Sequence, residues 1–323
     1  MVKLNAGSVF LAVLASSGVW AAPSLEKRQS ITPLSSAQIA TFKPYSFFAA
    51  AAYCNPSTTR NWTCGTNCNA NADFIPVASG GDGSSVQFWY VGYSPSLATV
   101  IVAHQGTDTS KIEADATDAN IIRRSLNSSL FPGVSSSISV HDGFGDEQEK
   151  TATQVLAAVN SAISAHGAKK VTIVGHSLGA AISLLDSVYL PLHISGVTFQ
   201  SFLYGMPRVG NQDFADYVDA HLHQTRITNK KDLVPIVPGR FLGYHHPSGE
   251  VHIEQDGSWD SCPGKSFSHN TTFLAAASEI FQQAKITQVI NASSVLYQTS
   301  LMARPVIMLD HMTGSIWDAE RLD

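Results

Sequence analysis

The chain has 323 residues, of which 20 are Lys or Arg and 25 are Asp or Glu, so its formal net charge is −5. With 44% hydrophobic and 14% charged residues it has a globular composition, which excludes intrinsic disorder. The acidic balance, with no run of more than two basic residues, argues against a nucleic-acid partner. No repeat or linker interrupts the chain, so we expect one domain.

The N-terminal 22 residues have the pattern of a secretory signal peptide. Lys3 precedes a short apolar stretch, and small residues near position 21 provide a cleavage site. The apolar stretch is too short to span a bilayer. The basic pair Lys27-Arg28 predicts a propeptide of residues 23–28, leaving a domain of residues 29–323. We therefore expect a secreted, extracellular protein with no transmembrane segment.

The cysteines fit the same oxidising compartment. Cys64 and Cys68 are close enough in the chain for a local disulfide, which leaves Cys54 to pair with Cys262. No histidine flanks the close pair, as a zinc site would require. Four acceptor triplets for N-glycosylation are present, at Asn61, Asn127, Asn270 and Asn291.

Hydrophobic patterning predicts strands that alternate with helices. This order is typical of an α/β fold with a mostly parallel sheet, helices on both faces and a site at the carboxyl ends of the strands. Predicted strands span 86–93, 99–104, 137–141, 171–174, 197–204 and 225–228, and predicted helices span 146–166, 178–189 and 213–222.

A G-x-S-x-G turn around Ser177 joins a predicted strand to a predicted helix. Its two glycines allow the sharp turn that lifts a serine hydroxyl above a sheet, and the helix N-terminus behind it favours developing negative charge. The alternative is a glycine-rich turn with an idle serine. The preceding strand and the Ala-rich helix that follows favour Ser177 as a nucleophile.

Three motifs together resemble those of the secreted fungal class 3 lipases. They are HQGTD at 104–108, GHSLGAA at 175–181 and GMPRVGN at 205–211. The resemblance covers about residues 45–264. It implies an α/β-hydrolase fold, a Ser-Asp-His triad and hydrolysis of acylglycerol esters at a lipid–water interface, with no metal or organic cofactor.

The acid and the base of the triad are sought in the chain order Ser, acid, His. Asp232 is the first carboxylate after the strand at 225–228 and matches the acid position of the family. For the base, Asp310-His311 with Gly314 is the nearest match to the family motif, and His269 is the alternative. Before His311, residues 265–308 form an atypical stretch, which is either an insertion or a product of a faulty gene model.

The oxyanion donors are predicted on two loops. Leu178 offers the backbone N–H directly after the nucleophile, and by resemblance Thr107 offers a second N–H and its hydroxyl. Next to Thr107, apolar residues of 110–126 recur at helical spacing, where the family carries a helical lid. A helix that faces the core would show the same stripe.

Two other functions stay open at this stage. The same scaffold supports feruloyl and other aryl esterases, and an inactive secreted binding protein would also fit, because the region that carries the base is atypical. Acylglycerols are favoured over phospholipids, since the net charge is negative. The sequence does not indicate an oligomeric state.

Overall fold

A computed structural model describes residues 30–107 and 122–264, and the structural statements below concern those residues. Several predictions therefore lie outside the described residues: the signal peptide, the propeptide, the stretch at 265–308, both candidate bases His269 and His311, and the two acceptors Asn270 and Asn291.

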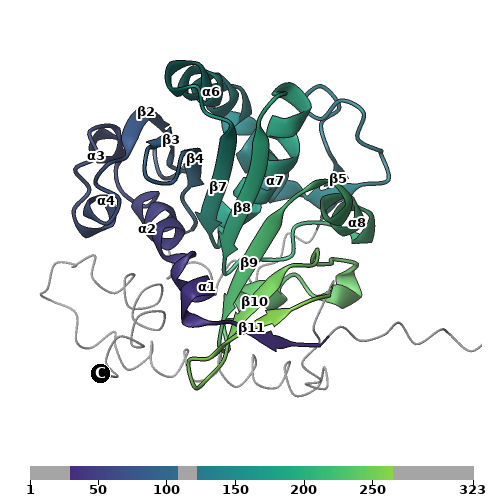
Figure 1. The fold of residues 1–323 in the computed structure, drawn as a ribbon. Coiled ribbons are helices and arrows are strands. Elements are labelled where there is room, and N and C mark those ends of the chain that lie inside the picture. The colour runs from purple at the N-terminus through teal and green to yellow at the C-terminus, as the bar shows by residue number, and fades with distance from the viewer. Residues whose placement is uncertain (1–29, 108–121, 265–323) are drawn as a thin grey trace, which may run out of the picture.

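A twisted sheet forms the centre of the molecule, with strand order β1-β11-β10-β9-β8-β7-β4-β3-β2 (Figure 1). The inner strands from β4 to β10 run parallel, and the strands outside them pair antiparallel. The strands are β1 (Thr32–Pro33), β2 (Ile75–Gly80), β3 (Trp89–Ser94), β4 (Thr99–His104), β7 (Lys170–His176), β8 (Thr198–Tyr204), β9 (Gln224–Asn229), β10 (Glu250–Ile253) and β11 (Trp259–Cys262). The α/β prediction is confirmed.

Helices cover both faces of this sheet (Figure 1). α6 and α7 pack on one face and α2 packs on the other. The described α-helices are α1 (Ser36–Ala40), α2 (Lys43–Ala51), α3 (Pro56–Arg60), α4 (Thr66–Asn69), α6 (Asp142–His166), α7 (Leu178–His193) and α8 (Gln212–His221), with 3-10 turns η1 (Val234–Ile236) and η2 (Arg240–Leu242). Of these helices, none is long and apolar enough to cross a membrane.

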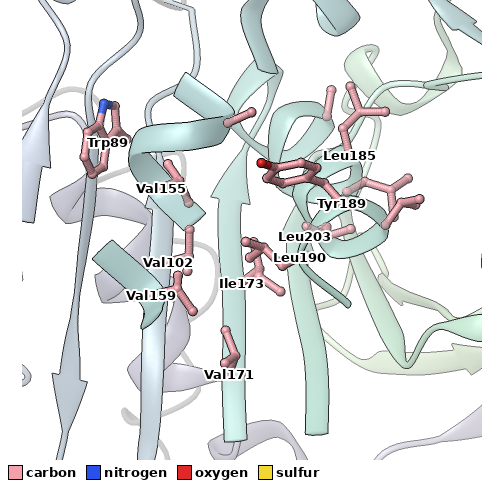
Figure 2. Packing of buried hydrophobic residues seen from close by; sticks show 14 of the residues in the cluster. Trp89, Val102, Val155, Val159, Val171, Ile173, Leu185, Tyr189, Leu190 and Leu203 are labelled. Carbon is pink, nitrogen blue, oxygen red and sulfur yellow. The ribbon is translucent and has the colours of Figure 1, made fainter. Parts of the chain in front are cut away.

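Alternation along the strands divides the core into two layers. In β4, Val102 lies with α6 and α7, whereas Ile101 and Ala103 lie with α2. Figure 2 shows the first layer, in which Val102 and Ile173 lie beneath helix side chains. Burial on both faces explains why β4 and β7 read as continuous apolar runs. Each fully buried Val, Leu or Ile contributes about 1.5–3 kcal/mol, so the central strands are firmly held.

Two predicted elements differ in the structure. The strand predicted at 137–141 is β6 (Ser139–His141), which pairs with β5 (Arg123–Ser125) in a separate two-stranded sheet. β5 also contradicts the end of the helix predicted over 110–126. The reason is tertiary: Arg124 forms ion pairs of 2.6–3.0 Å with three carboxylates of α6, which fix it in an extended segment. Residues 108–121 lie outside the description.

One of the two predicted disulfides is present. Cys64 and Cys68 are bridged, with Cα atoms 5.2 Å apart. Cys54 and Cys262 are both free, so their predicted bridge is wrong. The Cys54 sulfur lies 3.9 Å from the carbonyl oxygen of Cys64, near β3, whereas Cys262 ends β11. Six strand spacings in the sheet order separate β3 from β11, about 29 Å at about 4.8 Å each, and a disulfide needs Cα atoms within about 7 Å.

Candidate active site

Ser177 lies in the sharp turn between β7 and α7, as the motif predicts. Its φ of 56° and ψ of −127° are strained for a residue with a side chain, and its backbone N–H donates to the carbonyl of Tyr204 at 3.0 Å. The residue is 3% exposed. Leu178 is the first residue of α7, and an N–H in the first turn has no acceptor within its own helix. A free first-turn N–H is what the predicted oxyanion role of Leu178 requires, and that role stays a prediction.

Glycine is required where the turn meets the oxyanion loop. A Cβ built on Gly179 would lie 2.2 Å from the carbonyl oxygen of His104, and one on Gly175 would lie 2.3 Å from the carbonyl oxygen of Gly179. Both distances are far below any real contact. The start of α7 therefore packs backbone to backbone against the end of β4. A side chain at Gly179 would push the two segments apart.

The loop after β4, which carries Thr107, lies against Ser177. A Cβ on Gly106 would lie 3.2 Å from Ser177 Cβ and 2.5 Å from the His176 carbonyl oxygen. Gln105 secures the loop from the other side, since its N–H and its side-chain oxygen both bond the backbone of Phe88, at 2.8 and 2.9 Å. Thr107 follows directly and is half-buried. The structure thus brings the Thr107 loop beside Ser177.

Tyr53 reaches the same place from the segment after α2. Its hydroxyl lies 2.8 Å from Nδ1 of His176, and 2.3 Å from the position a Gly106 Cβ would take. The phenol therefore covers the junction between the oxyanion loop and the nucleophile turn. Sequence reasoning missed this residue, because 123 positions separate it from His176 and no motif contains it.

A buried polar chain supports the loop from beneath. His104 Nε2 lies 2.7 Å from Asp186 Oδ2, and Gln148 donates to Asp186 Oδ1 at 2.8 Å. All three side chains are at most 1% exposed. This network links the last residue of β4 to the middle of α7 and to α6. It was also missed, because each residue alone resembles an ordinary polar position of a strand or helix.

Asp232 lies beyond the end of β9, two strands from the nucleophile in the sheet. Its N–H donates to the carbonyl of Asn229 at 3.0 Å, and its Oδ1 accepts from the N–H of Val234 at 3.0 Å. A Cβ on Gly205 would lie 3.0 Å from Asp232 Oδ2 and 3.4 Å from the His176 ring. The carboxylate and the turn at Ser177 therefore flank the same point. Both segments follow the carboxyl ends of parallel strands, β9 and β7, which lie two places apart in the sheet.

Two of the described histidines after Asp232 have side chains with structural partners. His246 is buried and its Nε2 donates to the carbonyl of Pro235 at 2.8 Å, while His252 pairs with Thr228 on the neighbouring strand at 2.8 Å. Burial lowers the pKa of His246 well below 6.5. The assignment of His311, or of His269, as the base stays a prediction. Within 30–107 and 122–264, no cluster of His, Cys, Asp or Glu could hold a metal ion.

Apolar side chains are exposed on the acid side of the site. Leu233 and Ile236, directly after Asp232, are 45% and 43% exposed, and Phe241 of η2 is 71% exposed. Ile122 is 62% exposed. It lies near η2, because its carbonyl accepts a hydrogen bond of 3.4 Å from the hydroxyl of Tyr244, two residues after η2. Exposed apolar groups gathered beside a site are typical of contact with an apolar partner.

Comparisons with known proteins agree with this geometry. Residues 101–242 match the family Lipase (class 3). A secreted mono- and diacylglycerol lipase of Malassezia globosa is 35% identical over 199 residues, which are 60% of this chain and 65% of the relative. Across such Malassezia relatives, the chain spans 62–65% of the relative's length, less than two thirds.

Solved lipase structures share the fold. Lipase II from Rhizopus niveus has a TM-score of 0.65 and 27% identity, covering 75% of this chain and 90% of its own. A triacylglycerol lipase whose catalytic centre is described as a serine protease triad has a TM-score of 0.65 and 25% identity, covering 75% and 91%. In the match over 101–242 and in its α/β-hydrolase fold, the chain is similar to the class 3 lipases.

Proposed function

We propose that this protein is a secreted lipase that hydrolyses the ester bonds of acylglycerols through an acyl-enzyme on Ser177. One observation carries the proposal: the strained Ser177 turn lies between the Thr107 loop and the Asp232 carboxylate. These are the positions that a nucleophile, an oxyanion hole and a triad acid occupy in acyl transfer. The names of the Malassezia relatives support mono- and diacylglycerols as substrates.

The proposed reaction has two steps, with His311 as the predicted base. His311, oriented by Asp232, accepts the proton of Ser177 as its oxygen attacks the ester carbonyl carbon. The N–H of Leu178 and the N–H and hydroxyl of Thr107 stabilise the oxyanion. Collapse breaks the ester bond, and the departing alcohol takes the proton from His311. Water then attacks the acyl-enzyme, His311 accepts and returns its proton, and the fatty acid leaves with Ser177 restored.

Secretion and interfacial action are part of this proposal. The Cys64–Cys68 disulfide supports an oxidising compartment, and the relatives are named as secreted. The exposed Leu233, Ile236 and Phe241 support contact with a lipid surface beside the site. Because these side chains follow Asp232 in the chain, a substrate that leaves such a surface would enter the site beside Asp232.

The mechanism is tested by labelling and turnover. A serine-directed phosphonate should label the protein, and Ser177→Ala should abolish both labelling and ester hydrolysis. Ser161→Ala is the matched control, because Ser161 is exposed on α6 and donates only to the helix carbonyl of Ala157. Hydrolysis by Ser177→Ala at the wild-type rate would disprove the assignment.

The base and the substrate need separate measurements. His311→Gln should lower kcat at least ~10³-fold, as loss of a triad member does, whereas His269→Gln should not. The reverse result would make His269 the base. Rates on emulsified acylglycerols should exceed those on soluble aryl esters, and the opposite order would indicate an aryl esterase. Absence of phosphonate labelling in the folded protein would indicate an inactive binding protein.

A further inference from the structure

The loop that carries Asp232 has little regular structure of its own. Between β9 and η2 it contains only the short turn η1, and Leu233 and Ile236 on it are largely exposed. Such a loop cannot hold a carboxylate in one place through packing alone. Its backbone carbonyls are instead bound by two side chains that come from other parts of the chain.

Arg208 supplies most of these bonds. It lies between β8 and α8, and its guanidinium Nη1 donates to the carbonyls of Ile236 and, at 2.9 Å, of Pro238. Its backbone N–H donates to the carbonyl of Val237 between them, also at 2.9 Å. One residue thus binds three successive carbonyls of the acid loop. Burial lowers the pKa of Arg208 to about 10, which still leaves the guanidinium charged near neutral pH.

The same segment also bounds the carboxylate itself. Gly205, three residues before Arg208, is the point from which a Cβ would lie 3.0 Å from Asp232 Oδ2. A second brace comes from His246, whose Nε2 donates to the carbonyl of Pro235 at 2.8 Å. Since the carbonyl can only accept, Nε2 carries the proton. Arg208 and His246 therefore hold the acid loop by its carbonyls at 235–238. The segment that begins at Gly205 lies beside the carboxylate of Asp232.

We propose that Arg208 is a positioning residue, which holds Asp232 where the base requires it and influences the reaction only through Asp232. The inference rests on the proposed function, in which Asp232 orients the base. Misplacement of a catalytic group by about 1 Å can cost about 10²-fold in rate. A loop that loses the guanidinium bonds at Ile236 and Pro238 has room for such a shift, because its exposed side does not hold it.

A double-mutant cycle tests this dependence. Arg208→Met is made in the wild type and in Asp232→Asn, and kcat and KM are measured on a soluble p-nitrophenyl ester together with the rate of phosphonate labelling of Ser177. In the wild type, kcat should fall about 10- to 100-fold, with KM changed less than about threefold. In the Asp232→Asn background, the same substitution should change kcat less than about threefold.

Two further variants separate positioning from folding. Arg208→Lys keeps the charge but loses the planar guanidinium, whose Nη1 donates to both carbonyls in a fixed geometry, so its kcat should lie between those of the wild type and Arg208→Met. Arg208→Lys also replaces Arg208→Met in the double-mutant cycle if Arg208→Met does not fold. Arg60→Met, on exposed α3, is the matched control and should leave kcat unchanged.

The outcomes distinguish this inference from the proposed function. If Asp232→Asn lowers kcat but Arg208→Met and Arg208→Lys retain the wild-type kcat, the positioning role is overturned and the triad stands. An equal loss from Arg208→Met in both backgrounds overturns it too, because a general loss of structure would act independently of Asp232. A wild-type kcat for Asp232→Asn overturns both.

Discussion

Gly106→Ala tests the backbone contact on which the oxyanion hole depends. The added Cβ would lie 2.5 Å from the His176 carbonyl oxygen and 2.3 Å from the Tyr53 hydroxyl. A carbon atom and a carbonyl oxygen approach to about 3.3 Å, so the loop must retreat by about 0.8 Å from His176. Tyr53 could turn aside, but the carbonyl belongs to the turn that fixes Ser177. The proposed oxyanion donors of Thr107 should therefore move away from Ser177.

The magnitude follows from the loss of one preorganised donor. Such a loss costs about 10²–10³ in kcat, or about 2.7–4 kcal/mol of transition-state stabilisation. The donor acts mainly on the transition state, so KM for a soluble p-nitrophenyl ester should change by less than about threefold. Adding Tyr53→Phe should not restore kcat, because it removes only the hydroxyl and leaves the His176 carbonyl in place.

A matched glycine provides the control. In Gly143→Ala the new Cβ would meet the His141 ring at 3.4 Å, an ordinary contact, in the first turn of α6. That variant should keep the wild-type kcat and should gain up to about 1 kcal/mol of stability, since alanine suits a helix better than glycine. If Gly106→Ala keeps kcat within threefold of the wild type while remaining folded, the backbone contact does not set the oxyanion hole.

Three further predictions concern stability and covalent state. Because burial holds the folded pKa of His246 well below 6.5, the unfolded chain binds a proton that the folded chain does not, and stability should fall below pH 6.5 by up to about 1.4 kcal/mol per pH unit. Measured by urea unfolding, the free energy of unfolding should fall less between pH 7 and pH 5 in His246→Gln than in the wild type. Equal losses in the two proteins would contradict a neutral buried imidazole. Denaturation without reductant should expose two thiols, Cys54 and Cys262, to a thiol reagent, whereas none would indicate the bridge between them. Glycopeptide mapping of the secreted protein should find Asn61, which is exposed, more fully occupied than Asn127, which is half-buried; the reverse order would show that folded-state access does not decide occupancy.

The sequence predicted the centre of the fold because local signals and burial agree there. β4 and β7 are apolar on both faces, and α7 follows its nucleophile turn directly. Strand 99–104 was predicted to the residue. The short outer strands β10 and β11 were not predicted, because four residues of mixed polarity carry no clear period.

The errors have physical causes that lie outside any local window. A helical stripe over 110–126 competes with the ion pairs that Arg124 makes to α6, and only the tertiary structure decides in favour of a strand. The Cys54–Cys262 pairing followed from counting thiols, which says nothing of their distance in the sheet. Tyr53 and Arg208 act on segments 123 and about 30 positions away, where no spacing rule applies.

The two halves of the site are held by different means, and this decides how each responds to change. Ser177 and the Thr107 loop are fixed by contacts between backbones at Gly106 and Gly179, so any added atom forces them apart. Asp232 is held through side-chain bonds from Arg208 to its loop, and these can be weakened by degrees. An oxyanion hole needs donors within a few tenths of an ångström, whereas an acid that orients a histidine tolerates more. We therefore expect glycine substitutions at the first half to act in an all-or-none way, and substitutions of Arg208 to give a graded series of kcat values.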